Sequence, residues 1–248
     1  MLRSVRFKML LGLWLVGVVY GGLQACTGKP PFPEVEELVV IYEGTFDDPI
    51  PVPNGTIKAW RDSKQVFKMV SGFAFKDVEL GEGEARQPAR ALIVSDSFLD
   101  NLGIAPQLGR AFLPGEGHDG DAPRVVMLSG ELWQEAFDGS PEVIGQSVRV
   151  GEDERIIVGV VPPKIRFPTS SDHFDLLLPL ATPLEASDPG DHQLNVVVRR
   201  DKELGGIEKA FEMITENGYT ACDHPMFAAE ITAIYTKGFP DPEELERE

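Results

Sequence analysis

The feature that most constrains this sequence is a single long apolar run near its N-terminus, residues 9–23. Arg3, Arg6 and Lys8 precede the run, and the first charge after it is Lys29. Fifteen residues are few for a transmembrane helix, which needs about 20, whereas a basic segment followed by a short apolar run is typical of an export signal. We therefore expect the rest of the chain to be exported as a globular protein, and its length allows one domain or two small ones.

The apolar run ends in a cysteine motif. Residues 23–26, LQAC, resemble the bacterial lipobox, in which an aliphatic residue and then a small residue precede a cysteine. This resemblance implies that residues 1–25 are a cleaved signal peptide of the lipoprotein type and that Cys26 becomes a lipid-modified N-terminus. Two alternatives stay open: an uncleaved single-span membrane anchor, which the lack of charge before Lys29 allows, and plain secretion.

The charge balance argues against one class of partner. The chain has 23 Lys plus Arg against 40 Asp plus Glu, a net charge of −17. Such a charge repels phosphate backbones and anionic headgroups, so we do not expect nucleic-acid binding. The two cysteines, Cys26 and Cys222, are too few for a disulfide framework.

Short strand and helix patterns fill the remaining chain. Residues 26–37 are rich in proline and predict an extended tether. Strands are predicted where apolar residues run together or alternate, and helices where apolar residues recur at helical spacing behind a capping residue. The predicted strands are 38–42, 69–80, 89–94, 124–128, 147–150, 155–161, 175–180, 193–199 and 229–235. The predicted helices are 54–67, 95–103, 129–137 and 204–214, capped by Asn54, Ser95 and Ser129 in the first three, and residues 237–248 form an acidic tail.

The candidate chemical groups have ordinary explanations. Residues 116–121, EGHDGD, offer oxygen ligands, but their spacing is not that of a twelve-residue calcium loop, so we predict a solvated acidic turn. Residues 222–224, CDH, supply two ligands where zinc needs about four. His173 and His192 are isolated in the sequence. We predict no catalytic residue, no metal site and no cofactor.

Two longer stretches resemble a known family. They are RALIVSDSFLDNLGIAPQLGRAFLPGE, residues 90–116, and RVVMLSGELWQEAFDGSPEVIGQSVRVGEDERIIVGVVPPKIRFP, residues 124–168. With their G-R-x-F and V-x-L-S motifs they are similar to the MacB-like periplasmic core domain of ABC transporter permeases, and most of all to the acidobacterial duplicated orphan permeases.

The resemblance implies an α/β (α+β) fold of two lobes. The porter-like lobe would comprise residues 38–105 and 173–236, and a smaller α/β lobe would be inserted at 106–172. In that family the domain lies outside the cytoplasmic membrane, between the first two membrane helices of the permease, and engages adaptor or substrate proteins without a cofactor or catalysis of its own.

From these observations we expect a stand-alone, non-catalytic module in the bacterial periplasm, lipid-anchored at Cys26. It would act by protein–protein interaction with an ABC transporter permease or an adaptor in an export or envelope system. Two alternatives are a ligand-binding lipoprotein that reuses the fold and a truncated permease fragment held by one transmembrane helix.

Overall fold

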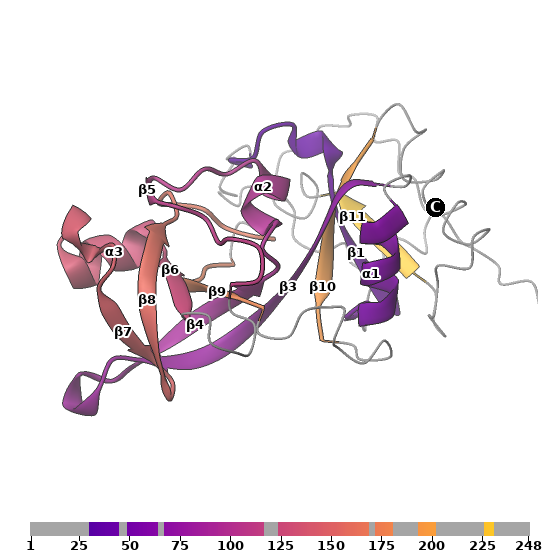
Figure 1. The fold of residues 1–248 in the computed structure, drawn as a ribbon. Helices are drawn as coiled ribbons and strands as arrows, with labels where there is room; N and C mark the ends of the chain where they lie inside the picture. The colour runs from indigo at the N-terminus through magenta and orange to yellow at the C-terminus, as the bar shows by residue number, and fades with distance from the viewer. Residues whose placement is uncertain are drawn as a thin grey trace, which may run out of the picture.

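The computed structural model describes residues 30–44, 49–63, 67–116, 124–168, 172–180, 193–201 and 226–230. These residues form a mixed α/β fold in which a large sheet carries a few short helices, as the sequence predicted (Figure 1). The strands are β1 (Leu38–Gly44), β2 (Pro49–Ile50), β3 (Phe67–Leu80), β4 (Gln87–Val94), β5 (Leu108–Gly109), β6 (Val125–Leu128), β7 (Ser147–Val150), β8 (Asp153–Val160), β9 (Leu176–Pro179), β10 (Asn195–Arg200) and β11 (Met226–Glu230).

The helices are short, and several begin or end where the sequence predicts. Ser129 caps its helix by accepting a hydrogen bond from the Leu132 amide. Gly103 ends another helix in the left-handed conformation, with φ 70°. The helical elements are η1 (Val35–Glu37), α1 (Asn54–Ser63), η2 (Gly83–Ala85), α2 (Phe98–Leu102), α3 (Gly130–Phe137) and η3 (Pro141–Val143).

The described strands belong to one sheet. Its main path runs β11-β1-β10-β3-β4-β9-β6-β8-β5, with β2 paired to β1 and β7 paired to both β3 and β8. Neighbours are antiparallel except for the β4–β9 and β6–β8 pairs, which are parallel. The first and last described strands therefore lie side by side at one end of the path, β11 against β1.

Strand β3 runs through most of the length of the sheet. Over its first half it pairs with β10, and from Phe73 to Leu80 it pairs with β4. Leu80 also pairs with Val150 of β7. At about 3.3 Å per residue, its 14 residues separate its two ends by roughly 40 Å. The strand thus joins two regions of the molecule that lie far apart (Figure 1).

Both faces of the sheet are buried. On one face α1 packs its fully buried Trp60 beside Phe67, with ring centroids 5.7 Å apart. On the other face Phe167 makes edge contacts with Phe73 and Phe98, at 4.9 and 5.2 Å between centroids. A third apolar cluster includes Leu132 of α3 and buried residues of β6, β8 and β9. The uninterrupted apolar sequence of β1 follows from this arrangement, because β1 is buried on both sides.

Two predictions around α1 are wrong. Asn54 is the first helical residue and not the cap, because the amides of Thr56 and Ile57 donate to the Pro53 carbonyl. The helix ends at Ser63, and Phe67 begins β3. The apolar spacing misled because Phe67 does contact Trp60, but from a strand rather than from the next helical turn.

Other predictions differ by a few residues or lie beyond the described part. The first residue of α2 is Phe98, with Ser97 and not Ser95 at the cap position. Strand β11 is described over Met226–Glu230, whereas the sequence predicted 229–235. The predicted helix 204–214 and the acidic tail 237–248 lie outside the described residues. The division into lobes 38–105 with 173–236, and 106–172, stays a prediction.

Candidate functional site

The most elaborate polar arrangement of the described chain surrounds the segment that follows the predicted anchor. Residues 26–37 were expected to form an extended tether, but residues 30–37 are packed into the fold. Phe32 is 3% exposed and Val35 is 4% exposed. The ring of Phe32 meets Phe167 edge-on, with 6.0 Å between centroids, so the segment extends the aromatic cluster of the core. The tether prediction is therefore wrong for residues 30–37, because its apolar side chains find partners far away in the sequence.

A close contact with α2 also holds the segment. The ring of Pro33 lies against Gly103, so that a Cβ built on Gly103 would be 3.1 Å from Cγ of Pro33. Glu34 then adopts a left-handed conformation, with φ 48°, and turns the chain into η1. This turn directs the carbonyls of Pro33 and Glu34 toward the end of β10, where Arg199 lies.

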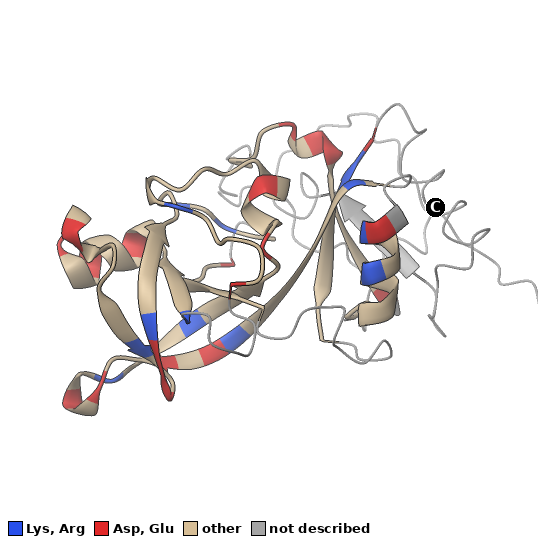
Figure 2. Cartoon of the chain, viewed as in Figure 1, with Lys and Arg blue, Asp and Glu red and all other residues tan. Residues whose placement is uncertain are grey.

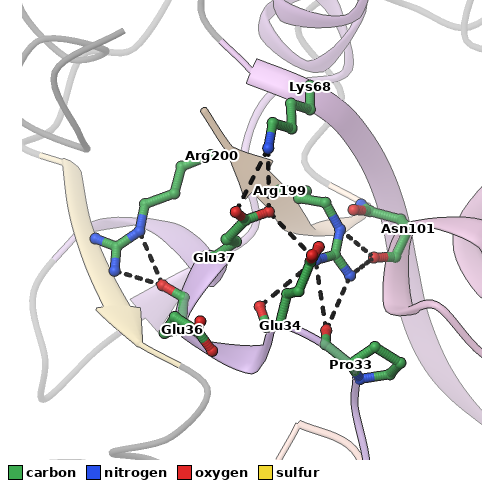
Figure 3. Close-up of polar contacts among 8 residues, drawn as sticks. All are labelled: Pro33, Glu34, Glu36, Glu37, Lys68, Asn101, Arg199 and Arg200. Atoms are coloured by element: carbon green, nitrogen blue, oxygen red, sulfur yellow. Dashed lines mark hydrogen bonds and ion pairs between the residues drawn. The ribbon is translucent and has the colours of Figure 1, made fainter. Parts of the chain in front are cut away.

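Arg199 is the centre of the arrangement, and its guanidinium joins β10 to α2 and to residues 33–37 (Figure 3). Its Nε and Nη2 donate to the Asn101 carbonyl at 3.0 and 2.7 Å. Its Nη1 and Nη2 each lie 3.4 Å from the Pro33 carbonyl oxygen. An arginine suits this position because its planar fork presents five N–H donors in fixed directions, whereas a lysine presents three from one nitrogen.

The charge of Arg199 is balanced by a buried carboxylate. Glu37 is only 6% exposed, and its Oε2 lies 3.5 Å from Nη1 of Arg199 and 3.3 Å from Nζ of Lys68. The more exposed Glu34 also lies within 3.5 Å of Arg199. Removing one partner of a buried ion pair leaves an uncompensated charge, which is strongly destabilising. We therefore expect that a substitution of either Glu37 or Arg199 alone leaves the other charge without its partner and destabilises the fold.

Two neighbours complete the set. Asn101 donates from Nδ2 to the Val197 carbonyl at 3.0 Å and to Oγ of Ser71 at 3.2 Å, which ties α2 to β10 and β3. Arg200 donates to the Glu36 carbonyl through Nε at 3.0 Å and also through Nη2. We call the residues of Figure 3 the N-terminal clamp; they are Pro33, Glu34, Glu36, Glu37, Lys68, Asn101, Arg199 and Arg200.

The clamp offers fixed charges and hydrogen bonds rather than a reacting group. The arrangement fastens residues 33–37 to the end of β10 and to α2. It joins the N-terminal segment to the domain.

A second polar cluster closes the loop that contains the G-R-x-F motif. Arg110 and Glu116 form two parallel hydrogen bonds, of 2.7 and 2.6 Å, and the Leu113 amide also donates to Glu116. The hydrogen bond from Arg110 is the main cause that lowers the pKa of the Glu116 carboxyl below its ordinary value. Glu116 was predicted to belong to a solvated acidic turn, and the structure assigns it this role in closing the loop.

The other residues singled out from the sequence are not brought together by the described part of the chain. Cys26, the predicted lipid attachment site, lies outside the described residues, as do His118, His192 and residues 222–224. His173 is described and exposed. Within the described residues no group of three or more His, Cys, Asp or Glu side chains is placed to hold a metal ion. No helix there is both long and apolar enough to cross a membrane.

The sequence did carry a signal for the clamp that the predictions missed. The strand NVVVRR ends in two arginines after a wholly apolar stretch, and EVEE places Glu37 directly before the apolar β1. A charged residue at the edge of a buried strand is most simply explained by an opposite charge nearby. The pairing of Leu38 with Arg199 in the sheet then brings these two signals together.

Comparison with known proteins decides the family. The model of the MacB-like periplasmic core domain matches residues 15–212, most of the chain. The chain belongs to this family. The matched range includes every residue of the N-terminal clamp. No curated protein matches the chain significantly in sequence.

Solved structures agree with this family in fold. The periplasmic region of MacB from Actinobacillus actinomycetemcomitans is 14% identical with a TM-score of 0.60, and the match covers 80% of this chain and 90% of that one. A domain of a putative permease protein from Porphyromonas gingivalis is 17% identical with a TM-score of 0.59, covering 87% and 98%. The extracellular domain of the noncanonic ABC-type transporter YknZ from Gram-positive bacteria is 14% identical with a TM-score of 0.51, covering 77% and 99%. The chain is thus related to the periplasmic domains of ABC permeases.

Proposed function

We propose that this MacB-like domain is a non-catalytic module of the bacterial periplasm, held at a membrane by lipid on Cys26. It acts by binding a protein of an ABC export or envelope system, either a permease or an adaptor. The observation that carries the proposal is the N-terminal clamp, which fastens the segment directly after the predicted anchor to β10 and α2. If Cys26 is anchored, this segment is the place where the anchor is connected to the fold.

The polar clusters of the described residues stabilise the fold, and the family supports a binding role. The clamp contains arginine, lysine and carboxylates in structural ion pairs, and the Arg110–Glu116 pair closes a loop. The family is that of a periplasmic core domain, and the structural relatives include domains of transporters and permeases. Binding to a partner of such a system is the function that uses both the anchor and the fold.

The mass of the mature chain tests the anchor. If Cys26 is lipidated, the protein purified from bacterial membranes begins at Cys26 and exceeds the mass of residues 26–248 by its acyl groups. Cys26→Ser abolishes this added mass and the partition of the mature chain into the detergent phase. Cys222→Ser, which changes the other cysteine, leaves both unchanged. A mature chain that begins at Cys26 or elsewhere without acyl groups contradicts the proposal, as does a chain that retains Met1.

Crosslinking in intact cells tests the partner. The proposal predicts that a permease or adaptor protein of an ABC system is recovered with the wild-type chain and lost when the membrane is solubilised without crosslinking. Crosslinks to no such protein, together with a rise in melting temperature on adding a small molecule, would instead support the ligand-binding lipoprotein, since a ligand stabilises the state that binds it.

A further inference from the structure

We propose that the clamp end of the molecule is held against the headgroup surface of the bilayer. The clamp end is the end formed by residues 30–37, α2 and the Arg199 end of β10. This inference rests on the lipid anchor proposed above and adds to it a distance and an orientation. It follows from the length of chain that the fold leaves free.

The packed fold begins much closer to Cys26 than the sequence suggests. If residues 26–37 were a free tether, these 12 residues would reach about 40 Å when fully extended. Pro30 is already buried, however, and Phe32 is 3% exposed. Residues 27–29 alone separate Cys26 from Pro30. Whatever their conformation, four Cα–Cα steps cannot exceed about 14 Å.

The clamp prevents the tether from lengthening. To release residues 30–37, the chain must expose Phe32 and Val35 and separate the buried Glu37 from Arg199. Breaking such a buried pair leaves an uncompensated charge, and exposing the two apolar side chains adds the cost of hydrating their surface. The short reach is therefore a stable property of the native fold.

The opposite end of the molecule lies well beyond this reach. The turn between β3 and β4 follows Leu80, while Lys68 of the clamp lies near the start of β3. The length of β3 separates the two by roughly 40 Å, and Figure 1 shows the turn at the lower left, with η1 and α2 at the top. We call the turns β3–β4 and β7–β8 the hairpin end.

The net charge favours an upright orientation on the short link. A chain of net charge −17 is repelled by an anionic leaflet, within about a Debye length of 8–10 Å at physiological ionic strength. An orientation in which only the clamp end approaches the headgroups keeps the carboxylates of the hairpin end, such as Glu79, Glu82 and Glu84, beyond that distance. The short link keeps the clamp end near the headgroups, and electrostatic repulsion keeps the hairpin end away from them.

The experiment compares two labelled positions in the full chain. In a Cys222→Ser background, Asp100→Cys places a fluorophore on α2 at the clamp end, and Glu84→Cys places it at the hairpin end. Both native side chains are acidic and exposed. The purified lipidated proteins are reconstituted in vesicles of phosphatidylcholine and phosphatidylglycerol that contain a small fraction of lipid with a headgroup nitroxide. We expect the nitroxide to quench the label at position 100 several-fold more strongly than the label at position 84.

A longer tether provides the control. Inserting about 12 Gly and Ser residues between Lys29 and Pro30 adds a root-mean-square reach of about 19 Å, and the difference in quenching should fall. Equal quenching at the two positions in vesicle-bound protein, or stronger quenching at position 84, overturns this inference and leaves the lipid anchor intact. Failure of the protein to bind vesicles at all, with a label incorporated at a free Cys26 in the Cys222→Ser parent, overturns the anchor and this inference together.

Discussion

The clamp end and the hairpin end both use charged residues, but in opposite ways. At the clamp end Arg199 and Glu37 are 8% and 6% exposed, and the guanidinium also serves backbone carbonyls of Pro33 and Asn101. At the hairpin end the ion pair between Arg86 and Glu79 joins side chains that are 40% and 55% exposed. Figure 2 shows charges of both signs around these two turns.

The hairpin end is joined by backbone hydrogen bonds and by exposed side chains. Gly81 donates to the Arg149 carbonyl at 2.9 Å, and Gly151 donates to the Glu79 carbonyl at 2.7 Å. The side-chain hydrogen bond between the two turns, from Arg149 Nε to Glu82 Oε1 at 2.8 Å, lies at the exposed surface. An exposed ion pair contributes about 0–1 kcal/mol to the free energy of unfolding. Removing one partner of a buried ion pair costs about 3–5 kcal/mol. The difference teaches that, of these two ends, only the clamp end depends on buried charge.

The largest predicted effect is that of Arg199→Gln. The substitution leaves the buried carboxylate of Glu37 facing Lys68 alone and removes most donors from the Asn101 and Pro33 carbonyls. We expect the free energy of unfolding to fall by about 3 kcal/mol, the lower part of the range for a broken buried pair because Lys68 remains. Urea unfolding followed by tryptophan fluorescence measures this change.

A double-mutant cycle sharpens the same prediction. Adding Glu37→Gln to Arg199→Gln removes the uncompensated carboxylate, so the double variant should lose less stability than the sum of the two single variants. Simple additivity would show that the two side chains do not interact. It would also make the clamp end no different from the hairpin end.

The second prediction separates apolar from ionic contributions at the clamp end. Phe32→Leu keeps an apolar side chain but loses the edge contact with Phe167 and part of the buried ring area. We expect a loss of about 1–2 kcal/mol in the free energy of unfolding. The loss should not change between low and high salt, whereas the effect of Arg199→Gln depends on charge. No change in stability would mean that residues 30–37 do not contribute to the core.

The comparison of the two ends also explains what the sequence could predict. Ser129 and Gly103 were identified because their roles depend on residues three to five positions away, such as Leu132 and Leu99. The strand 38–42 was identified because an apolar run buried on both faces has no other simple explanation. Family motifs then supplied the fold class, which local patterns alone would not give.

The clamp could not be predicted in the same way. Arg199 and Pro33 are 166 positions apart in the sequence, and nothing in the local pattern around residue 33 indicates a distant donor. The prolines of residues 30–33 suggested a free tether, yet their position is set by Phe167 and Gly103. Contacts that depend on the final topology are visible only after β1 and β10 have been paired.

The third prediction concerns a site of intermediate exposure, the Arg110–Glu116 pair, whose side chains are 43% and 14% exposed. Because Arg110 holds the pKa of Glu116 below its ordinary value, the charged carboxylate stabilises the fold at neutral pH. This contribution is complete above the ordinary glutamate pKa of about 4.3 and is lost as the pH falls through the lowered pKa of the folded state. Glu116→Gln should cost about 1 kcal/mol at pH 7.

The pH dependence distinguishes this prediction from a general loss of packing. As the pH falls from 7 through the ordinary glutamate pKa and then through the lowered pKa of the folded state, the difference in unfolding free energy between wild type and Glu116→Gln should shrink, because the wild-type carboxylate takes up a proton. A constant difference across this range would assign the effect to lost contacts and not to charge. We expect the contribution of this ion pair to stability to lie between those of the ion pairs at the clamp end and at the hairpin end.

The smallest predicted effect is that of Arg86→Gln at the hairpin end. Arg86 lies 2.8 Å from Glu79 and 3.9 Å from Glu152, but all three side chains are at least 40% exposed. Water and salt screen such pairs, so we expect a change of at most about 0.5 kcal/mol. Arg86→Gln is also the matched control for Arg199→Gln, since both exchange the same two residue types. A loss at position 86 as large as that at position 199 would show that burial does not decide the value of these charges. It would also remove the reason for treating the clamp end as the end of the domain that buried charge holds together.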